Sequence, residues 1–234
     1  MSKASIERQL QALGNVEIAS HSQGFFKTGP GQYGEGDVFL GIRVPILRKQ
    51  VKGLRGETLA VVQALLHSQF HEARLLALLL LVDRFERGDE ELRQKIYQVY
   101  LENTAYIDNW DLVDSSAHKI VGAHLQYKPR QILYQLASSD LLWERRIAMI
   151  ASFWFIKDDD FADALALAKL LLHDEHDLMH KAVGWGLREV GNRQRQVMED
   201  FLVQHYHSMP RTMLRYAIEK LPEPRRQEYL KGTI

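Results

Sequence analysis

The sequence predicts an all-α protein of stacked helical hairpins, arranged as a right-handed α-α superhelix (a solenoid). Two observations support this prediction. Apolar residues recur at helical spacing almost everywhere beyond the first forty or so residues, and no useful stretch alternates with the period of a strand. In addition, five segments share a weak pattern that repeats roughly every thirty to forty residues, as expected for HEAT-like repeats.

Hydrophobic spacing places the helices in order along the chain. The first contains Leu59–Leu66, the second contains Leu76–Phe85 and ends at Gly88, and the third contains Leu92–Tyr100. Further helices are expected at Asn109–Leu125, Pro129–Leu136, Leu141–Ile156, Phe161–Leu172, Leu178–Val190, Gln194–Tyr206 and Pro210–Leu221.

The repeated pattern lies in the second helix of successive pairs and has a small residue at its centre. These central residues are Ala77, Ala117, Ala148, Ala182 and Ala217. In a solenoid each hairpin buries its faces against its neighbours, and the stack leaves a concave surface. We expect one domain over residues 1–234, with an irregular helical bundle as the alternative.

Composition excludes several classes of protein and of site. The chain has 234 residues, of which 46% are hydrophobic and 26% charged, as in a typical globular domain. Cysteine is absent, which excludes disulfides, thiolate metal ligands and a cysteine nucleophile. The longest apolar run, Leu75–Val82, is too short to cross a bilayer, and the first residues have no apolar signal segment. We therefore expect a cytoplasmic protein.

The charge is balanced overall but segregated along the chain. Formal net charge is zero, yet the stretch from Val38 to Gly56 carries five cations and no acid. Acidic residues gather instead around Asp83–Glu91 and Asp158–Asp160. A polyanion responds to the local field rather than to net charge, so one basic face is compatible with DNA binding. An ordinary solvated surface explains the same pattern equally well.

Two motifs resemble ligand sites but lack the context that such sites need. Gly29, Gly31 and Gly34 have dinucleotide-binding spacing, but Phe25–Lys27 before them resembles a helix end rather than a strand. His176 and His180 have the spacing of a zinc helix, without a third ligand. We place His176 near a helix start and expect neither a metal nor a cofactor.

The segment Asn109–Asp114 carries the most informative side chains. Trp110 and Asp114 are four residues apart, so a helix presents the indole and the carboxylate on one face. Trp185 and Arg146 lie in other second helices. A carboxylate, aromatic faces and an arginine on one concave wall could hold a cationic ligand beside a phosphate. We assign Trp143 and Trp154 to packing.

Four segments together resemble the AlkD family of DNA alkylation repair glycosylases, which are HEAT-like solenoids. They are Phe39–Pro45 (FLGIRVP), Trp110–Asp114 (WDLVD), Leu142–Ala148 (LWERRIA) and Lys181–Glu189 (KAVGWGLRE). They occur in the family's order and spacing, and the resemblance covers nearly the whole chain.

The resemblance implies an enzyme that hydrolyses the N-glycosidic bond of cationic N3- and N7-alkylated purines without flipping the base. It implies that Asp114 is the catalytic carboxylate, that Trp110 and Trp185 are the flanking indoles, and that Arg146 faces the DNA. The partner would be double-stranded DNA that contains alkylated bases, and the protein a monomer. We expect further DNA contacts from Lys27, Arg43, Arg48, Lys49 and Arg188.

The sequence departs from the family at the end of the N-terminal helical segment. The family commonly has a Tyr shortly before a Lys on the DNA-facing side, whereas this chain has Phe25, Phe26 and Lys27, followed by a Gly-rich loop with Tyr33. Some members of the superfamily bind DNA without glycosylase activity. Two alternatives therefore remain: a non-catalytic DNA-binding protein and a HEAT-like scaffold for protein interactions.

Overall fold

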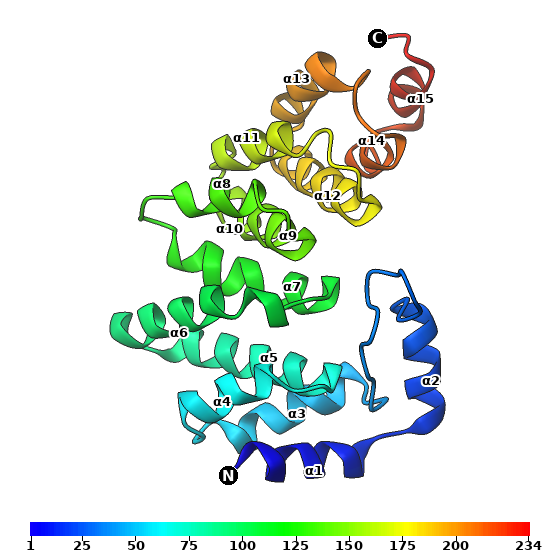
Figure 1. Cartoon of the computed structure of the whole chain (residues 1–234). Coiled ribbons are helices and arrows are strands. Elements are labelled where there is room, and N and C mark those ends of the chain that lie inside the picture. The colour runs from blue at the N-terminus through cyan, green and yellow to red at the C-terminus, as the bar shows by residue number, and fades with distance from the viewer. The chain divides into compact units, whose positions relative to one another are not determined.

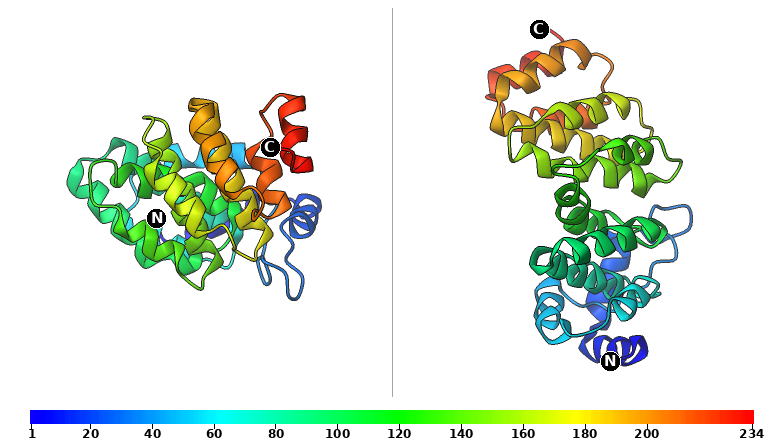
Figure 2. Two further views of the ribbon diagram at one scale, coloured as in Figure 1. Left: turned by 90° about the horizontal axis from the view of Figure 1, so that it is seen from above. Right: turned by 90° about the vertical axis from the view of Figure 1, so that its left-hand side faces the viewer.

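The computed structural model describes residues 1–234, and the chain is all-α as predicted (Figure 1). The one β-type contact is an isolated parallel bridge between Val38 and Phe70. Two further views also show helices throughout (Figure 2). No helix combines the length and the apolar character needed to cross a membrane.

The residues fall into two compact units, Met1–Ile120 and Val121–Ile234, and each is described by itself. The first unit contains α1 (Lys3–Leu13), α2 (Val16–Phe25), α3 (Val44–Leu54), α4 (Leu59–Leu66), α5 (His71–Arg87), α6 (Glu90–Glu102), a 3-10 turn (Thr104–Tyr106) and α7 (Trp110–Ala117). A π-helical turn (His118–Gly122) follows α7. The second unit contains α8 (Gln131–Ala137), α9 (Leu142–Ala151), α10 (Phe153–Ile156), α11 (Ala162–Leu170), α12 (Asp177–Arg193), α13 (Arg195–His205), α14 (Arg211–Ala217) and α15 (Glu223–Lys231).

Helix α5 forms the centre of the first unit. Its apolar run Leu75–Val82 is buried on all sides, because α1, α3, α4, α6 and α7 all pack against it. A helix that is apolar all round is stable in water only when other elements cover every face. The longest apolar run in the chain is therefore a core helix.

Helix α12 has the same central position in the second unit, where α9, α10, α11, α13 and α14 contact it. Gly184 and Gly186, one on each side of Trp185, allow this close packing. A Cβ added to Gly184 would lie 2.4 Å from the backbone oxygen of Met213 in α14. A Cβ added to Gly186 would lie 2.2 Å from the side chain of Met149 in α9. Trp185 is therefore carried by a tightly packed stretch of α12.

The five central alanines of the repeat pattern lie in α5, α7, α9, α12 and α14, and all five are buried. Helix α7 packs against α5, and α12 packs against both α9 and α14. Within each unit the second helices of successive pairs thus lie side by side, as the pattern predicts. A single domain and one continuous solenoid remain predictions.

Two of the predicted helices are interrupted. The helix expected at Asn109–Leu125 ends as a regular α-helix at Ala117 and continues as the π-helical turn. The helix expected at Leu141–Ile156 divides at Ser152, whose hydroxyl donates a hydrogen bond to the Met149 carbonyl at 2.7 Å. Gly122 lies close to this division, because a Cβ there would be 2.3 Å from the Ala151 oxygen. The two departures from a uniform helix therefore lie against each other, with a glycine at their contact.

Candidate functional site

Helix α7 begins at the residues that the sequence analysis singled out. Asn109, buried and just before the helix, accepts a hydrogen bond from the Trp110 backbone N–H through its side-chain oxygen at 2.9 Å. Leu112 and Val113 face the core, while Trp110 and Asp114 are both half-buried. The helical spacing therefore places the indole and the carboxylate on the same side of α7, as predicted.

The Trp110 indole packs against the two phenylalanines at the end of α2. The Phe26 ring lies parallel to it, with centroids 5.2 Å apart and planes at 15°, and the Phe25 ring meets it edge-on at 6.1 Å. Both phenylalanines lie at the end of α2, which confirms the helix end expected at Phe25–Lys27. Lys27 follows with an exposed side chain and a left-handed backbone (φ 53°).

Asp114 lies one turn along α7, near the buried Tyr100 of α6. The Tyr100 hydroxyl hydrogen-bonds to the Ser116 hydroxyl at 3.0 Å. Burial raises the pKa of Tyr100, the bond to Ser116 lowers it, and the charge of Asp114 raises it further. The Asp114 carboxylate is therefore close enough to the α6–α7 contact to influence a group inside it.

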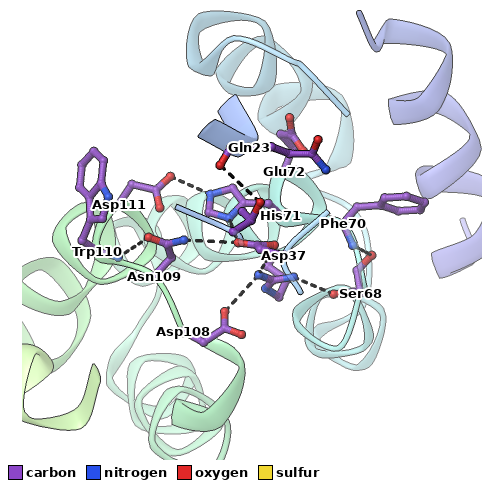
Figure 3. Close-up of polar contacts among 12 residues, drawn as sticks. Gln23, Asp37, Ser68, Phe70, His71, Glu72, Asp108, Asn109, Trp110 and Asp111 are labelled. Carbon is purple, nitrogen blue, oxygen red and sulfur yellow. Dashed lines mark hydrogen bonds and ion pairs between the residues drawn. The ribbon is translucent and has the colours of Figure 1, made fainter. Parts of the chain in front are cut away.

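A charged network that the sequence analysis missed fixes the start of α7 (Figure 3). His71 is the first residue of α5, and its side chain is 2% exposed. Its Nδ1 lies 2.7 Å from an oxygen of Asp37, and its Nε2 lies 2.8 Å from an oxygen of Asp111. In Figure 3 the Asp111 carboxylate points toward the His71 ring, whereas the Trp110 indole points away from it.

Both ring nitrogens of His71 face carboxylates, which only accept hydrogen bonds when ionised, so both nitrogens carry a proton. Burial lowers the pKa of His71, but the hydrogen bonds and charges of Asp111 and Asp37 outweigh it and raise that pKa to about 9. The pKa of Asp37 falls despite its burial, because His71 and Arg74 stabilise its charged form. His71 is thus an imidazolium at neutral pH.

Arg74 and Asp108 complete the network. The Arg74 guanidinium lies 2.9 Å from Asp37 and 3.1 Å from Asp108. Burial raises the pKa of Asp108, and the charge of Arg74 lowers it in part. Two buried cations of α5 thus face three carboxylates, which lie in the loop after α2, in the loop before α7 and in the first turn of α7.

A cavity of about 410 Å³ opens beside this network within the first unit. The apolar part of its wall is formed by Phe26, Phe39 and Ile42. The charged part comes from His71, Asp111 and Arg43. Arg43 is exposed and precedes α3, so this predicted DNA contact shares the cavity with Asp111. The predicted contacts Arg48 and Lys49 are exposed on α3 and do not line the cavity.

The remaining predicted site residues belong to the second unit. Trp185 is half-buried, donates a hydrogen bond from Nε1 to Glu189 at 2.8 Å, and meets the Phe153 ring edge-on at 4.8 Å. Arg188 forms an ion pair with Glu219. Arg146 is 4% exposed, and its Nη1 donates to the Leu178 carbonyl at 2.6 Å, which ties α9 to the first turn of α12.

The two residues assigned to packing are only partly covered. Trp143 and Trp154 are half-buried, and the Lys157 ammonium lies 4.6 Å from the Trp154 ring. His176 caps the start of α12, where its Nδ1 accepts from the Leu178 N–H, as expected. No group of three His, Asp or Glu side chains is arranged to hold a metal ion. The glycines of GPGQYG lie in turns with no strand before them.

Comparison with known proteins agrees with the resemblance in the sequence. The model of the DNA alkylation repair enzyme family matches residues 6–221. The chain belongs to this family. A solved structure described as "Predicted DNA alkylation repair enzyme from Enterococcus faecalis" matches with a TM-score of 0.69 at 18% identity, over 90% of this chain and 97% of that one. That likeness shows a shared fold. No curated protein matches the chain.

In this member of the DNA alkylation repair family, the sequence singled out Trp110 and Asp114 as candidates but gave no direct sign of the network of Asp37, His71 and Asp111. One signal could have found two of them. His71 lies six residues before the central Ala77 of its repeat, and Asp111 lies six residues before Ala117. Since α5 and α7 pack side by side, equivalent positions of these two helices become neighbours.

Proposed function

We propose that the protein is a DNA glycosylase that hydrolyses the N-glycosidic bond of cationic N3- and N7-alkylated purines in duplex DNA, without base flipping. The observation that carries the proposal is the pairing of the Asp114 carboxylate with the Trp110 indole on one side of α7, in a member of the DNA alkylation repair enzyme family. Membership in this family supports alkylated DNA as the substrate, and the carboxylate and the indole supply the groups that the hydrolysis needs.

Asp114 is the proposed catalytic carboxylate. An alkylated purine carries a positive charge, so its bond to the sugar is already weakened and the base leaves with the bonding electron pair. The sugar then develops oxocarbenium character, which a nearby negative charge stabilises. The same carboxylate can orient a water molecule toward the anomeric carbon and accept its proton. Hydrolysis then yields a free base and an abasic sugar.

Trp110 and Trp185 are the proposed indoles that flank the modified nucleotide. The face of an aromatic ring attracts a cation, and indole does so most strongly. Phe26 covers one face of Trp110, so we assign the opposite face to the nucleotide. Phe153 supports the Trp185 ring at its edge, and Glu189 holds its N–H. Both indoles therefore have fixed orientations, which reduces the entropy lost on binding.

The proposed DNA contacts are cationic. Lys27, Arg43, Arg48 and Lys49 are exposed in the first unit and can reach phosphates without breaking a buried contact. In the second unit we propose Arg146 and Arg188. The hydrogen bond of Arg146 to Leu178 fixes the direction of its guanidinium. We further propose that the helical hairpins of both units continue as one right-handed solenoid whose concave side carries these residues.

Incubation with methylated duplex DNA tests the proposal. The expected result is the release of free 7-methylguanine and 3-methyladenine, measured by chromatography, with a matching number of abasic sites. Unmethylated DNA serves as the control substrate. Salt-sensitive binding to DNA without base release would favour the non-catalytic DNA-binding protein. Absence of both binding and release would favour the scaffold for protein interactions.

A further inference from the structure

His71 reaches the start of α7 by two independent routes. The first is polar: its Nε2 hydrogen-bonds to Asp111, the residue next to Trp110. The second is an aromatic column in which the His71 ring stacks on Phe39 at 4.4 Å, Phe39 on Phe26 at 4.8 Å, and Phe26 on Trp110 at 5.2 Å. The indole of Trp110 is thus the far end of a column that begins at the buried imidazolium.

Asp111 depends on His71 more than Asp37 does. The Oδ2 atom of Asp111 bonds to His71, while its Oδ1 atom is buried without a hydrogen-bond partner. Asp37, by contrast, also accepts from Arg74 at 2.9 Å and from Asn109 at 3.3 Å. Loss of the proton shared with Asp111 would therefore leave a half-buried carboxylate without a donor, which is unfavourable.

The charged groups around His71 come from every element that packs against it. Asp37 follows α2, Asp108 and Asp111 belong to the loop before α7 and to α7 itself, and Arg74 lies on α5. The carboxylate of Glu72 accepts hydrogen bonds from the backbone N–H groups of residues 40–42. Glu17, His21 and Arg43 line the adjoining cavity. None of these groups replaces His71 as a donor to Asp111.

We propose that His71 is a positioning residue: as an imidazolium it holds the first turn of α7 against the Asp37 loop, and so sets the orientation of the Trp110 indole and the Asp114 carboxylate. This proposal rests on the glycosylase function proposed above. It adds a group that touches neither the base nor the sugar. A neutral imidazole has one N–H, so it cannot donate to both carboxylates, and the bridge from α7 through His71 to the Asp37 loop is then broken.

The first test observes Trp110 directly and does not require activity. The protein contains four tryptophans, so 5-fluorotryptophan gives a small set of fluorine NMR signals, and the Trp110→Phe variant assigns one of them. We expect the Trp110 signal to titrate with a midpoint near the His71 pKa of about 9. In Asp111→Asn the midpoint should fall by about one unit or more, because one of two charge partners is lost.

His67→Gln is the matched control. His67 also lies in the first unit, but it hydrogen-bonds to the neutral side chain of Asn103. This variant should leave the Trp110 titration unchanged. A Trp110 signal that does not titrate in the wild type, or whose midpoint is the same in Asp111→Asn, would overturn the proposal.

The second test separates positioning from a purely structural role. In single-turnover excision of 7-methylguanine well below the melting temperature, His71→Gln should react about ten- to a hundredfold more slowly, since small misplacements of reacting groups have effects of this size. DNA affinity should change less than about twofold, because the buried His71 side chain is not exposed to a phosphate. Asp111→Asn replaces His71→Gln if the latter does not fold.

The outcomes distinguish the two proposals. A wild type that releases no base contradicts the glycosylase function, while the fluorine titration still decides whether His71 positions Trp110. An active wild type with a wild-type rate in both His71→Gln and Asp111→Asn contradicts the positioning role alone.

Discussion

The chain segment 38–42, which joins the Gly-rich loop to α3, is held to the start of α5 by the carboxylate of Glu72 and by the bridge between Val38 and Phe70. Glu72 is 3% exposed. Its Oε2 accepts the Leu40 N–H at 2.8 Å, and its Oε1 accepts the N–H groups of Gly41 at 2.7 Å and Ile42 at 3.1 Å. This segment contributes Phe39 to the aromatic column and Ile42 to the cavity wall.

Glu72→Gln should therefore destabilise the protein strongly. Glutamine replaces one oxygen by an NH₂ group, so at least one buried backbone N–H faces a donor, and the remaining bonds lose their charge assistance. An unsatisfied buried donor costs about 1–3 kcal/mol and each of the two weakened bonds about 1 kcal/mol, which together give about 3–5 kcal/mol. Urea denaturation followed by circular dichroism measures this difference in the free energy of unfolding.

Glu86→Gln is the matched control, because Glu86 lies on the same helix with an exposed side chain. Its free energy of unfolding should stay within about 0.5 kcal/mol of the wild type. If Glu72→Gln is as stable as Glu86→Gln, the three hydrogen bonds do not hold the segment, and the reasoning is refuted.

Three further predictions follow from the same unit. Gly41→Ala should lower the free energy of unfolding by about 2 kcal/mol or more, because Gly41 has φ +80° and an added Cβ would lie 2.0 Å from the Asn15 oxygen. Gly24→Ala, in an open part of α2, is the control and should be neutral or stabilising in the same urea denaturation. Folding raises the pKa of His71 from 6.5 to about 9, which at 1.36 kcal/mol per pKa unit contributes about 3 kcal/mol to the free energy of unfolding. This contribution is complete below pH 6.5 and is lost as the pH rises through 9. Urea denaturation across this pH range measures the effect, and a free energy of unfolding that does not fall would contradict the charged state of His71. Arg48→Gln or Lys49→Gln should reduce the slope of log affinity for duplex DNA against log salt by about 0.9 each, and an unchanged slope would remove that residue from the DNA interface.

The repeat pattern could be predicted from sequence because its cause is local to each helix. A small residue is needed where one second helix crosses the next, and Ala77, Ala148 and Ala182 supply it while buried at those contacts. A long apolar stretch such as Leu75–Val82 has no polar face, so it predicts a helix that is buried on all sides.

The helices at the two ends were predicted incompletely for a physical reason as well. Only the end of α2 was expected and α15 was not, because α2 buries no residue fully and α15 buries only Tyr229, so neither has a strong apolar stripe. Helix α3 does bury Leu47, Val51 and Leu54, but it has only these three buried positions among exposed cations, so its apolar stripe is narrow. Local periodicity identifies a helix only when one of its faces enters a core.

The His71 network escaped prediction because its members are far apart in the chain. Asp37, His71 and Asp111 come from a loop and from the starts of two different helices, and only the packing of α5 against α7 brings them together. Trp110 and Asp114, in contrast, share one helix, so their four-residue spacing was sufficient to place them on one side.

The charge of Asp114 is proposed to drive removal of the alkylated base, and the Asp114→Asn variant tests this proposal most directly. The amide keeps the shape of the side chain but removes the negative charge beside the developing sugar cation. Single-turnover release of 7-methylguanine should fall by about a hundredfold or more, while DNA affinity stays the same or rises slightly. Asp140→Asn, an exposed position in the second unit, should excise at the wild-type rate. An active wild type whose Asp114→Asn variant releases 7-methylguanine at the same rate would contradict the account.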